Sequence, residues 1–232
     1  MDFSQFQTSN WKNLVTKSER LTLLQKLEDT MANEQGRDGR KVKTDESVVG
    51  MACGYYDSNQ PQYLYINECY IAEYSNNYCA MDTVIHEGRH AYQYDAINTY
   101  LLNGTIQGSK LGNAPKAPTN RDIELWIKNS MISNKPPYRK NHRKQAYYMF
   151  QPCEDDAHGY AYERMQQLEL KYNYHDENYT EYEKSDYIAW NEMAPITLAF
   201  VQKNPKQYIV ADIERRYSTF ISKYIEFFKK TK

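Results

Sequence analysis

The 232-residue chain has no long apolar run, no excess of charge of one sign and no closely spaced cysteine pair. A membrane-spanning helix needs about 20 consecutive apolar residues, and no such stretch occurs. The net charge of −1 gives no general attraction for nucleic acid or an acidic membrane, so we expect neither as a partner. Residues 1–13 have no basic segment and no apolar segment, so we expect no secretory signal. We therefore expect a protein made in the cytoplasm, whose export would require a non-classical secretion system.

The four cysteines are widely separated and include no C-x-x-C pair, which excludes the common zinc-ribbon and thioredoxin-like spacings. We expect them to be buried, reduced thiols. They are Cys53, Cys69, Cys79 and Cys153. Phenylalanine and tryptophan are also scarce, with 7 and 3 residues, whereas tyrosine occurs 23 times. Tyrosine packs its ring and still forms hydrogen bonds, so these residues are expected either to line half-buried surfaces or to replace phenylalanine in the core.

The length and the order of predicted elements favour one domain. We expect an α+β fold that is mainly helical, with a small β-sheet ahead of one long helix. The capping-box pair Thr16 and Glu19 begins the first helix, and a basic connector from Arg40 to Lys43 follows it. The expected parts are a helical N-terminal extension (1–45), a sheet with the long helix (48–100) and a second helical part (121–232).

The rest of the pattern predicts a hairpin, the long helix, a loop and four more helical stretches. The strands are predicted over 48–56 and 62–71, where apolar and polar residues alternate between turn residues. The helices are predicted over 77–100, 121–131, 147–172 with a restart at Pro152, 182–201 and 206–229. A stretch rich in Gly, Pro, Asn and Lys predicts a long loop over 102–120.

One short segment contains candidate metal ligands and a candidate base: His86-Glu87-Gly88-Arg89-His90. Helix residues four apart lie on one face, so both imidazoles can reach one ion. A catalytic zinc ion has three protein ligands and one water, and neutral imidazole is a good ligand. Glu87 is turned about 100° around the helix axis, where it can take a proton from that water without binding the metal. Because the chain has only 5 histidines, chance rarely produces this spacing.

A third ligand must come from elsewhere, and the segment from Pro152 to Ala161 offers candidates. A helix that starts at Pro152 places four side chains on one face: Glu154, Ala157, His158 and Ala161. The two alanines allow close packing on the histidine helix, which favours Glu154 as the third ligand. His158 is the alternative ligand, or a hydrogen-bond partner. Carboxylates that could orient an imidazole are Asp82, Asp155 and Asp156.

Taken together, the two motifs resemble the gluzincin branch of the zincin metallopeptidases, of which thermolysin is the familiar member. The second motif reads E-x-x-A-x-x-Y-A at Glu154, Ala157, Tyr160 and Ala161. It is similar to the E-x-x-A-N-x-F-A signature of bacterial peptidases related to those that cut phage-type repressors. Zincin-like modules also occur in bacterial toxins and mobile elements. The resemblance covers roughly residues 62–165.

The resemblance implies a zinc ion on His86, His90 and Glu154, with Glu87 as the catalytic base. It also implies an active-site helix beside a small sheet whose edge strand aligns an extended peptide. His158 departs from the pattern, because the repressor-cleaving group has Asn there and thermolysin-like enzymes have Asp. The 64 positions between His90 and Glu154 are many for the thermolysin type and suggest an inserted loop and helix.

The leading hypothesis is a zinc endopeptidase that hydrolyses a protein or peptide substrate by metal-activated water, as an effector, toxin or mobile-element product. One alternative is a catalytically inactive zincin-like protein with a binding or structural role, although Glu87 argues against a decayed site. Another is a metal-dependent hydrolase that acts on a different bond. Four residues are candidates for stabilising the oxyanion, and none is favoured: Tyr160, His142, Arg143 and Tyr148.

Overall fold

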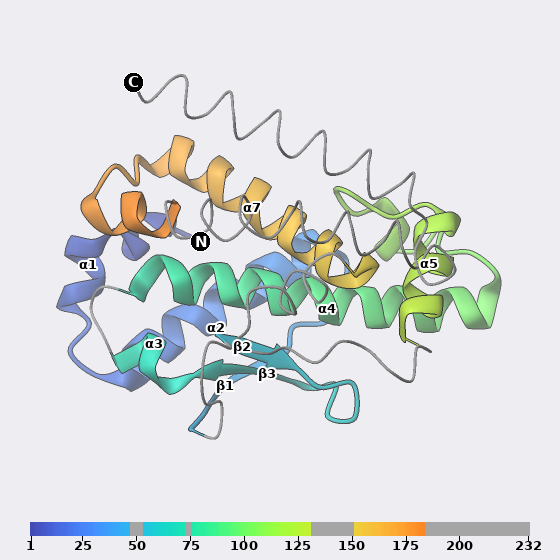
Figure 1. Cartoon of the computed structure of the whole chain (residues 1–232), viewed down its shortest axis with the longest axis horizontal. Helices are drawn as coiled ribbons and strands as arrows, with labels where there is room; N and C mark the ends of the chain where they lie inside the picture. Colours follow the sequence, from blue (N-terminus) through green and yellow to red (C-terminus); the bar gives the residue numbers. More distant parts are fainter. Residues whose placement is uncertain (47–52, 73–75, 131–150, 184–232) are drawn as a thin grey trace, which may run out of the picture.

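A computed structural model of the chain describes residues 1–46, 53–72, 76–130 and 151–183 (Figure 1). Its helices are η1 (Phe3–Phe6), α1 (Thr8–Asn13), α2 (Lys17–Glu34), α3 (Glu68–Ala72), α4 (Asn77–Asn103), η3 (Leu111–Asn113), α5 (Asn120–Ser130) and α7 (Pro152–Tyr172). Its strands are β1 (Lys41–Asp45), β2 (Gly54–Tyr56) and β3 (Tyr63–Asn67). The helices predicted over 182–201 and 206–229 lie wholly or largely outside the described residues, as do 147–150 of the helix before them.

Helix α4 runs through the middle of the described part, with the sheet on one side and α7 along the other, while α2 packs against it from behind (Figure 1). The sheet has the order β1-β3-β2. Strand β1 is parallel to β3, with Lys41 opposite Tyr63, and β2 is antiparallel to β3, with Tyr55 opposite Tyr65. Side chains alternate between the two faces of a strand, so the buried Leu64 and Ile66 of β3 share one face, and the partly exposed Tyr63 and Tyr65 share the other.

This architecture confirms the predicted fold class, a mainly helical α+β fold with a small sheet ahead of the long helix. It also confirms the hairpin between the two predicted strands. The predicted end of the second strand at Ile71 is wrong, because α3 begins at Glu68. The side chain of Asn67 accepts a hydrogen bond from the Cys69 N–H at 3.0 Å. That is the arrangement of a helix N-cap, and it ends the strand.

Strand β1 was not predicted: the basic connector at Arg40 to Lys43 forms it, so the N-terminal part predicted as helical ends in a strand. Val42 is the only buried residue of β1, and the alternation that marks a strand is therefore nearly absent from the sequence. Contacts from other elements hold the strand in place. The Val42 N–H donates to Gln25 Oε1 at 2.8 Å, and the Lys43 ammonium lies 3.4 Å from the centre of the Tyr63 ring.

Helix α2 begins where the capping box predicts. The Thr16 hydroxyl accepts a hydrogen bond from the Glu19 N–H, and the Glu19 carboxylate accepts one from the Thr16 N–H. Apolar residues of α2 share one core with the N-terminal helices, α4 and α7, and several tyrosines lie in that core. Fully buried members include Phe6, Trp11, Leu24, Leu27, Tyr78 and Tyr174. Tyrosine therefore replaces phenylalanine in part of this core.

A buried ion pair lies between α2 and α4. Glu28 and Arg37 have fully buried side chains, and the Arg37 Nη1 and Nη2 groups donate to the Glu28 carboxylate at 2.5 and 2.9 Å. Gly88 lies against this pair, and a Cβ atom there would be 2.7 Å from Arg37 Nη2 and 2.9 Å from Glu28 Oε2. The middle residue of the His-Glu-Gly-Arg-His segment therefore lets α4 approach the ion pair closely.

We expect Gly88→Ala to be destabilised relative to Gly159→Ala, a matched change on α7. Both helical variants gain about 1 kcal/mol from the better helix propensity of alanine. Only Gly88→Ala forces a methyl group into the buried ion pair, because no described atom lies within 4 Å of a Cβ at Gly159. The free energies of unfolding from urea titration should differ by about 1–3 kcal/mol, the usual cost of overpacking. Equal free energies of unfolding for the two variants would contradict the close approach of α4 to the ion pair.

The predicted loop over 102–120 is largely confirmed. Helix α4 extends to Asn103, and Gly104 ends it in the left-handed conformation at φ 72°. Two buried residues of the loop, Ile106 and Leu111, pack against α4 and α5, and the Tyr92 hydroxyl donates to the Leu111 carbonyl at 2.8 Å. The loop is therefore attached to the second half of α4.

The cysteines form no disulfide, but the prediction that they are buried is wrong. Cys69 is exposed and the other three are partly buried. Cys53 makes a polar contact, since its sulfur lies 3.1 Å from the Tyr70 hydroxyl. Neighbouring apolar and aromatic residues in the sequence therefore did not indicate burial of these thiols.

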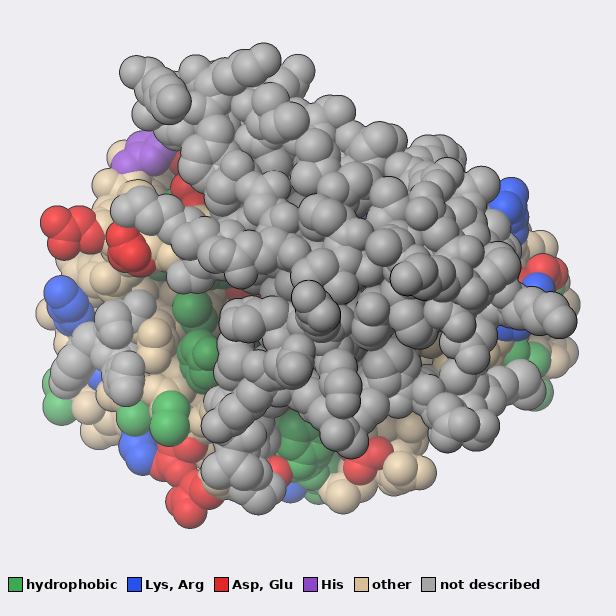
Figure 2. Space-filling model, viewed as in Figure 1, with side chains coloured by type: hydrophobic (Ala, Val, Ile, Leu, Met, Phe, Trp, Pro, Cys, Tyr) green, Lys and Arg blue, Asp and Glu red, His purple; other side chains and the backbone are tan. Residues whose placement is uncertain are grey.

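On the face shown in Figure 2, acidic and basic side chains of the described residues lie interspersed around the rim, and apolar side chains occupy small separate areas. This distribution agrees with the net charge of −1. None of the described helices combines the length and the apolar character needed to cross a bilayer.

Candidate metal centre

Helix α4 carries the first three candidate residues on its buried middle section. His86 and Glu87 are buried and His90 is partly buried. Their neighbours Val84, Ile85 and Ala91 are fully buried in the core, so packing on both sides of α4 fixes the rotation of the helix about its axis. The two imidazoles therefore lie on one face, with ring centroids 4.8 Å apart.

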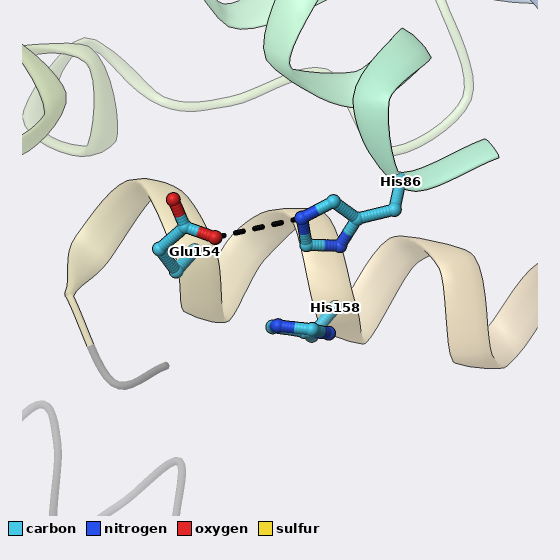
Figure 3. A group of neighbouring side chains, drawn as sticks. All are labelled: His86, Glu154 and His158. Carbon is cyan, nitrogen blue, oxygen red and sulfur yellow. Dashed lines mark ion pairs between the residues drawn. The ribbon is translucent and has the colours of Figure 1, made fainter. Parts of the chain in front are cut away.

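Helix α7 brings Glu154 to the same place. Pro152 lies in the first turn of α7, as expected, and Glu154 follows in that turn. Ala157 and Ala161 are buried, with at most 1% of their surface exposed, and α7 packs along α4. The small residues thus allow the close helix contact that the sequence predicted, and Glu154 faces His86 (Figure 3).

Three potential ligand atoms converge. The Nε2 atoms of His86 and His90 are 3.1 Å apart. The Glu154 Oε2 atom lies 3.5 Å from the His86 Nε2 and 3.4 Å from the His90 Nε2. A tetrahedral ion with bonds of about 2.0–2.1 Å has its ligand atoms about 3.3–3.4 Å apart. The triangle therefore has the size of one face of a zinc coordination tetrahedron, and the donor set fits that ion.

The charges of the three side chains also suit a cation. Burial alone would raise the pKa of Glu154, but His90 and His86 outweigh burial and hold it well below its usual value. Burial alone would lower the pKa of His90, but the Glu154 and Glu87 carboxylates raise it to about 10. A proton therefore competes with a cation for the His90 nitrogen, and the ionised Glu154 attracts either one.

Glu87 lies beside the triangle without being part of it. One carboxylate oxygen of Glu87 lies within 4.8 Å of a ring nitrogen of each of His86 and His90. Burial raises the pKa of Glu87, and the two histidines and the backbone of Tyr56 on β2 act in the opposite direction. A carboxylate with a raised pKa is better suited to accept and return a proton near neutral pH.

A hydrogen-bond chain orients His90. Its Nδ1 atom lies 2.9 Å from the Gln93 Oε1, which can only accept, so Nδ1 carries a proton and Nε2 is the nitrogen for which a second proton and a cation compete. The Gln93 amide nitrogen donates to Asp156 Oδ2 and to the Cys153 carbonyl, both at 2.8 Å. Asp156 therefore acts on an imidazole through Gln93. The buried His86 Nδ1 has no hydrogen-bond partner among the described residues.

Arg89 connects the elements around the centre, which the sequence did not reveal. It is 1% exposed, and its guanidinium donates through Nε and Nη2 to the Asp156 carboxylate at 2.8 and 3.1 Å. Its Nη2 also donates to the Lys116 carbonyl at 3.0 Å, which joins the loop to α4. The rings of Tyr92 and Tyr160 lie against it, with centroids 4.4 and 4.8 Å from Cζ. A lone cation on the apolar face of α4 is the sequence signal that could have identified it.

His158, the alternative third ligand, is also present at the centre. Its ring packs on His86, with centroids 4.2 Å apart and an angle of 53° between the planes. Burial and the neighbouring His86 hold the pKa of His158 well below its usual value. Of the oxyanion candidates, Tyr160 lies against Arg89, whereas the other three (His142, Arg143 and Tyr148) lie outside the described residues.

No family model, curated protein or solved structure matches this chain. The resemblance to the gluzincins therefore depends on the two motifs alone. Two segments 64 positions apart in the sequence supply three donor atoms within 3.5 Å of one another.

Proposed function

We propose that this chain is a zinc-dependent endopeptidase with a gluzincin-like centre. The observation that carries the proposal is the convergence of the His86 and His90 Nε2 atoms with the Glu154 Oε2 atom, at separations of 3.1–3.5 Å. Two imidazoles and one carboxylate are a ligand set that suits zinc and leaves one coordination position for water. A zinc ion in this position would act as a Lewis acid and would lower the pKa of a bound water molecule.

The side chains around the ligands have separate roles in the proposed reaction. Glu87 takes the proton of the attacking water and returns it to the leaving amine, and its burial raises its pKa above the usual value, which favours proton uptake. Gln93 and Asp156 hold His90 in the tautomer that binds a cation. Helix packing fixes these groups before any substrate arrives, which reduces the reorganisation that the reaction requires.

The edge of the sheet favours a peptide over other classes of substrate. Among the described strands β2 lies at one edge of the sheet, and its Tyr56 backbone lies next to the Glu87 carboxylate. An extended peptide can add to such an edge through main-chain hydrogen bonds. We place the scissile bond beside the Glu87 carboxylate for this reason. We also propose that the chain acts as an effector, toxin or mobile-element product.

Removal of zinc should abolish cleavage. We expect the purified chain to digest denatured casein, to lose this activity after treatment with 1,10-phenanthroline, and to regain it with Zn²⁺ but not with Mg²⁺, because imidazole ligands favour zinc. Casein cleavage that is unaffected by the chelator would contradict a metallopeptidase. A chain that binds zinc but cleaves neither casein nor a proteome-derived peptide library would favour the alternative, a catalytically inactive binding protein.

A further inference from the structure

The metal centre contains one more nitrogen donor than the proposed reaction uses. His158 follows Glu154 by one turn of α7, and Figure 3 shows both side chains beside His86, which comes from α4. One ligand atom from each of His86, Glu154 and His158 lies within 4.8 Å of the other two. These three residues thus form a second possible ligand group that overlaps the first.

His158 is relevant to how many protein ligands the ion would have. A tetrahedral ion held by His86, His90 and Glu154 has one position left. Catalytic zinc sites leave that position to water, whereas structural sites fill it with a fourth protein ligand. The backbone of His158 is fixed close by, because the buried Ala157 packs α7 onto α4, and a ligand atom of its ring lies within 4.8 Å of ligand atoms of His86 and Glu154.

The distance between the His86 and His158 rings can be compared with the distance expected for two imidazoles on one zinc ion. Two imidazoles bound to one tetrahedral zinc have ring centres about 5 Å apart. The His86 and His90 centroids are 4.8 Å apart, close to this value. The His86 and His158 centroids are 4.2 Å apart, so the His158 ring needs to turn away from the face of His86 in order to share an ion with it.

We propose that His158 is a fourth protein ligand that competes with water for the open position of the zinc ion. The proposal rests on the proposed function, since it uses the same three ligands. The resting protein then holds a closed, four-ligand site, and water enters only when His158 turns away. This arrangement suppresses hydrolysis until a substrate or another event displaces His158.

The test counts ligands and does not depend on a substrate. The full chain and its His158→Ala variant are loaded with zinc, and X-ray absorption spectroscopy counts the histidines and the water on the ion. Competition with a chromophoric chelator gives the zinc affinity of each. Asp155→Ala, on the same turn of α7, is the control.

We expect three histidines and no water in the parent protein, and two histidines with one water in His158→Ala. The zinc affinity of His158→Ala should fall at least about tenfold, whereas Asp155→Ala should bind zinc as the parent does. If His158→Ala does not fold, His158→Gln keeps most of the bulk and takes its place, with the same expected loss of one histidine.

Two other outcomes would count against the proposal and are distinguishable from each other. Two histidines and a water in the parent protein, with unchanged zinc affinity in His158→Ala, would show that His158 only packs on His86. The fourth ligand would then be excluded and the proposed peptidase would stand. A parent protein that binds no zinc would overturn both the fourth-ligand proposal and the proposed peptidase function.

Discussion

Replacement of Glu87 by glutamine is expected to reduce peptide-bond cleavage about 10²–10⁴-fold, the usual contribution of a general base. Glutamine has nearly the same shape as glutamate but cannot take the proton of the attacking water. The buried carboxylate lies within 4.8 Å of ligand atoms on both histidines without contributing to their triangle with Glu154. The variant should therefore keep its zinc and its fold.

Casein digestion with equal amounts of zinc-loaded parent and Glu87→Gln measures the effect, and metal analysis of both samples provides the control. A loss of zinc in the variant would mean that Glu87 is itself a ligand. Cleavage by Glu87→Gln at the rate of the parent would mean that another group serves as the base.

Replacement of Arg89 by methionine is expected to have the largest effect on stability. Methionine keeps much of the volume but leaves the Asp156 carboxylate without its cation. Loss of one partner from a buried ion pair costs about 3–5 kcal/mol. We expect the lower end of this range, because the Asp156 side chain is 20% exposed. The free energy of unfolding, measured by urea titration, should fall accordingly.

The double variant Arg89→Met/Asp156→Asn separates the lost charge pair from lost packing. Removal of the unpaired carboxylate should restore part of the stability, because the remaining amide can still bond to Gln93. A double variant that is less stable than Arg89→Met alone would contradict a charge effect and assign the loss to the ring contacts with Tyr92 and Tyr160. Zinc affinity should also fall in Arg89→Met, since the pair joins α4 to the helix that carries Glu154.

The convergence of His86, His90 and Glu154 could be predicted from the sequence because each of the two segments has a local pattern. The spacing of His86 and His90 depends only on the helical repeat, and the pattern around Glu154 favours it as a ligand because Pro152 starts a helix with alanines on one face. The structure places all three where those patterns indicate. The long helix and the capping box at Thr16 have local signals of the same kind.

Features that depend on contacts between distant segments could not be predicted. Strand β1 has only Val42 as a buried residue, and it exists because β3 and Gln25 supply its hydrogen-bond partners. Arg89 could not be matched to Asp156, because 67 positions separate them and the acidic segment offers several carboxylates. The role of Gln93 depends on the relative rotation of α4 and α7, which no single segment determines.

The most direct test of the metal centre is the zinc content and zinc affinity of the parent chain, of Glu154→Ala and of Asp155→Ala. We predict about one tightly bound zinc per chain in the parent and in Asp155→Ala, because three donor atoms already have the spacing of a tetrahedral face. Glu154→Ala should lose most of its zinc affinity, since it removes the only carboxylate of the triangle. A parent chain that binds no zinc after purification in zinc-supplemented buffer, or a Glu154→Ala variant with the affinity of the parent, would contradict the assignment of this centre.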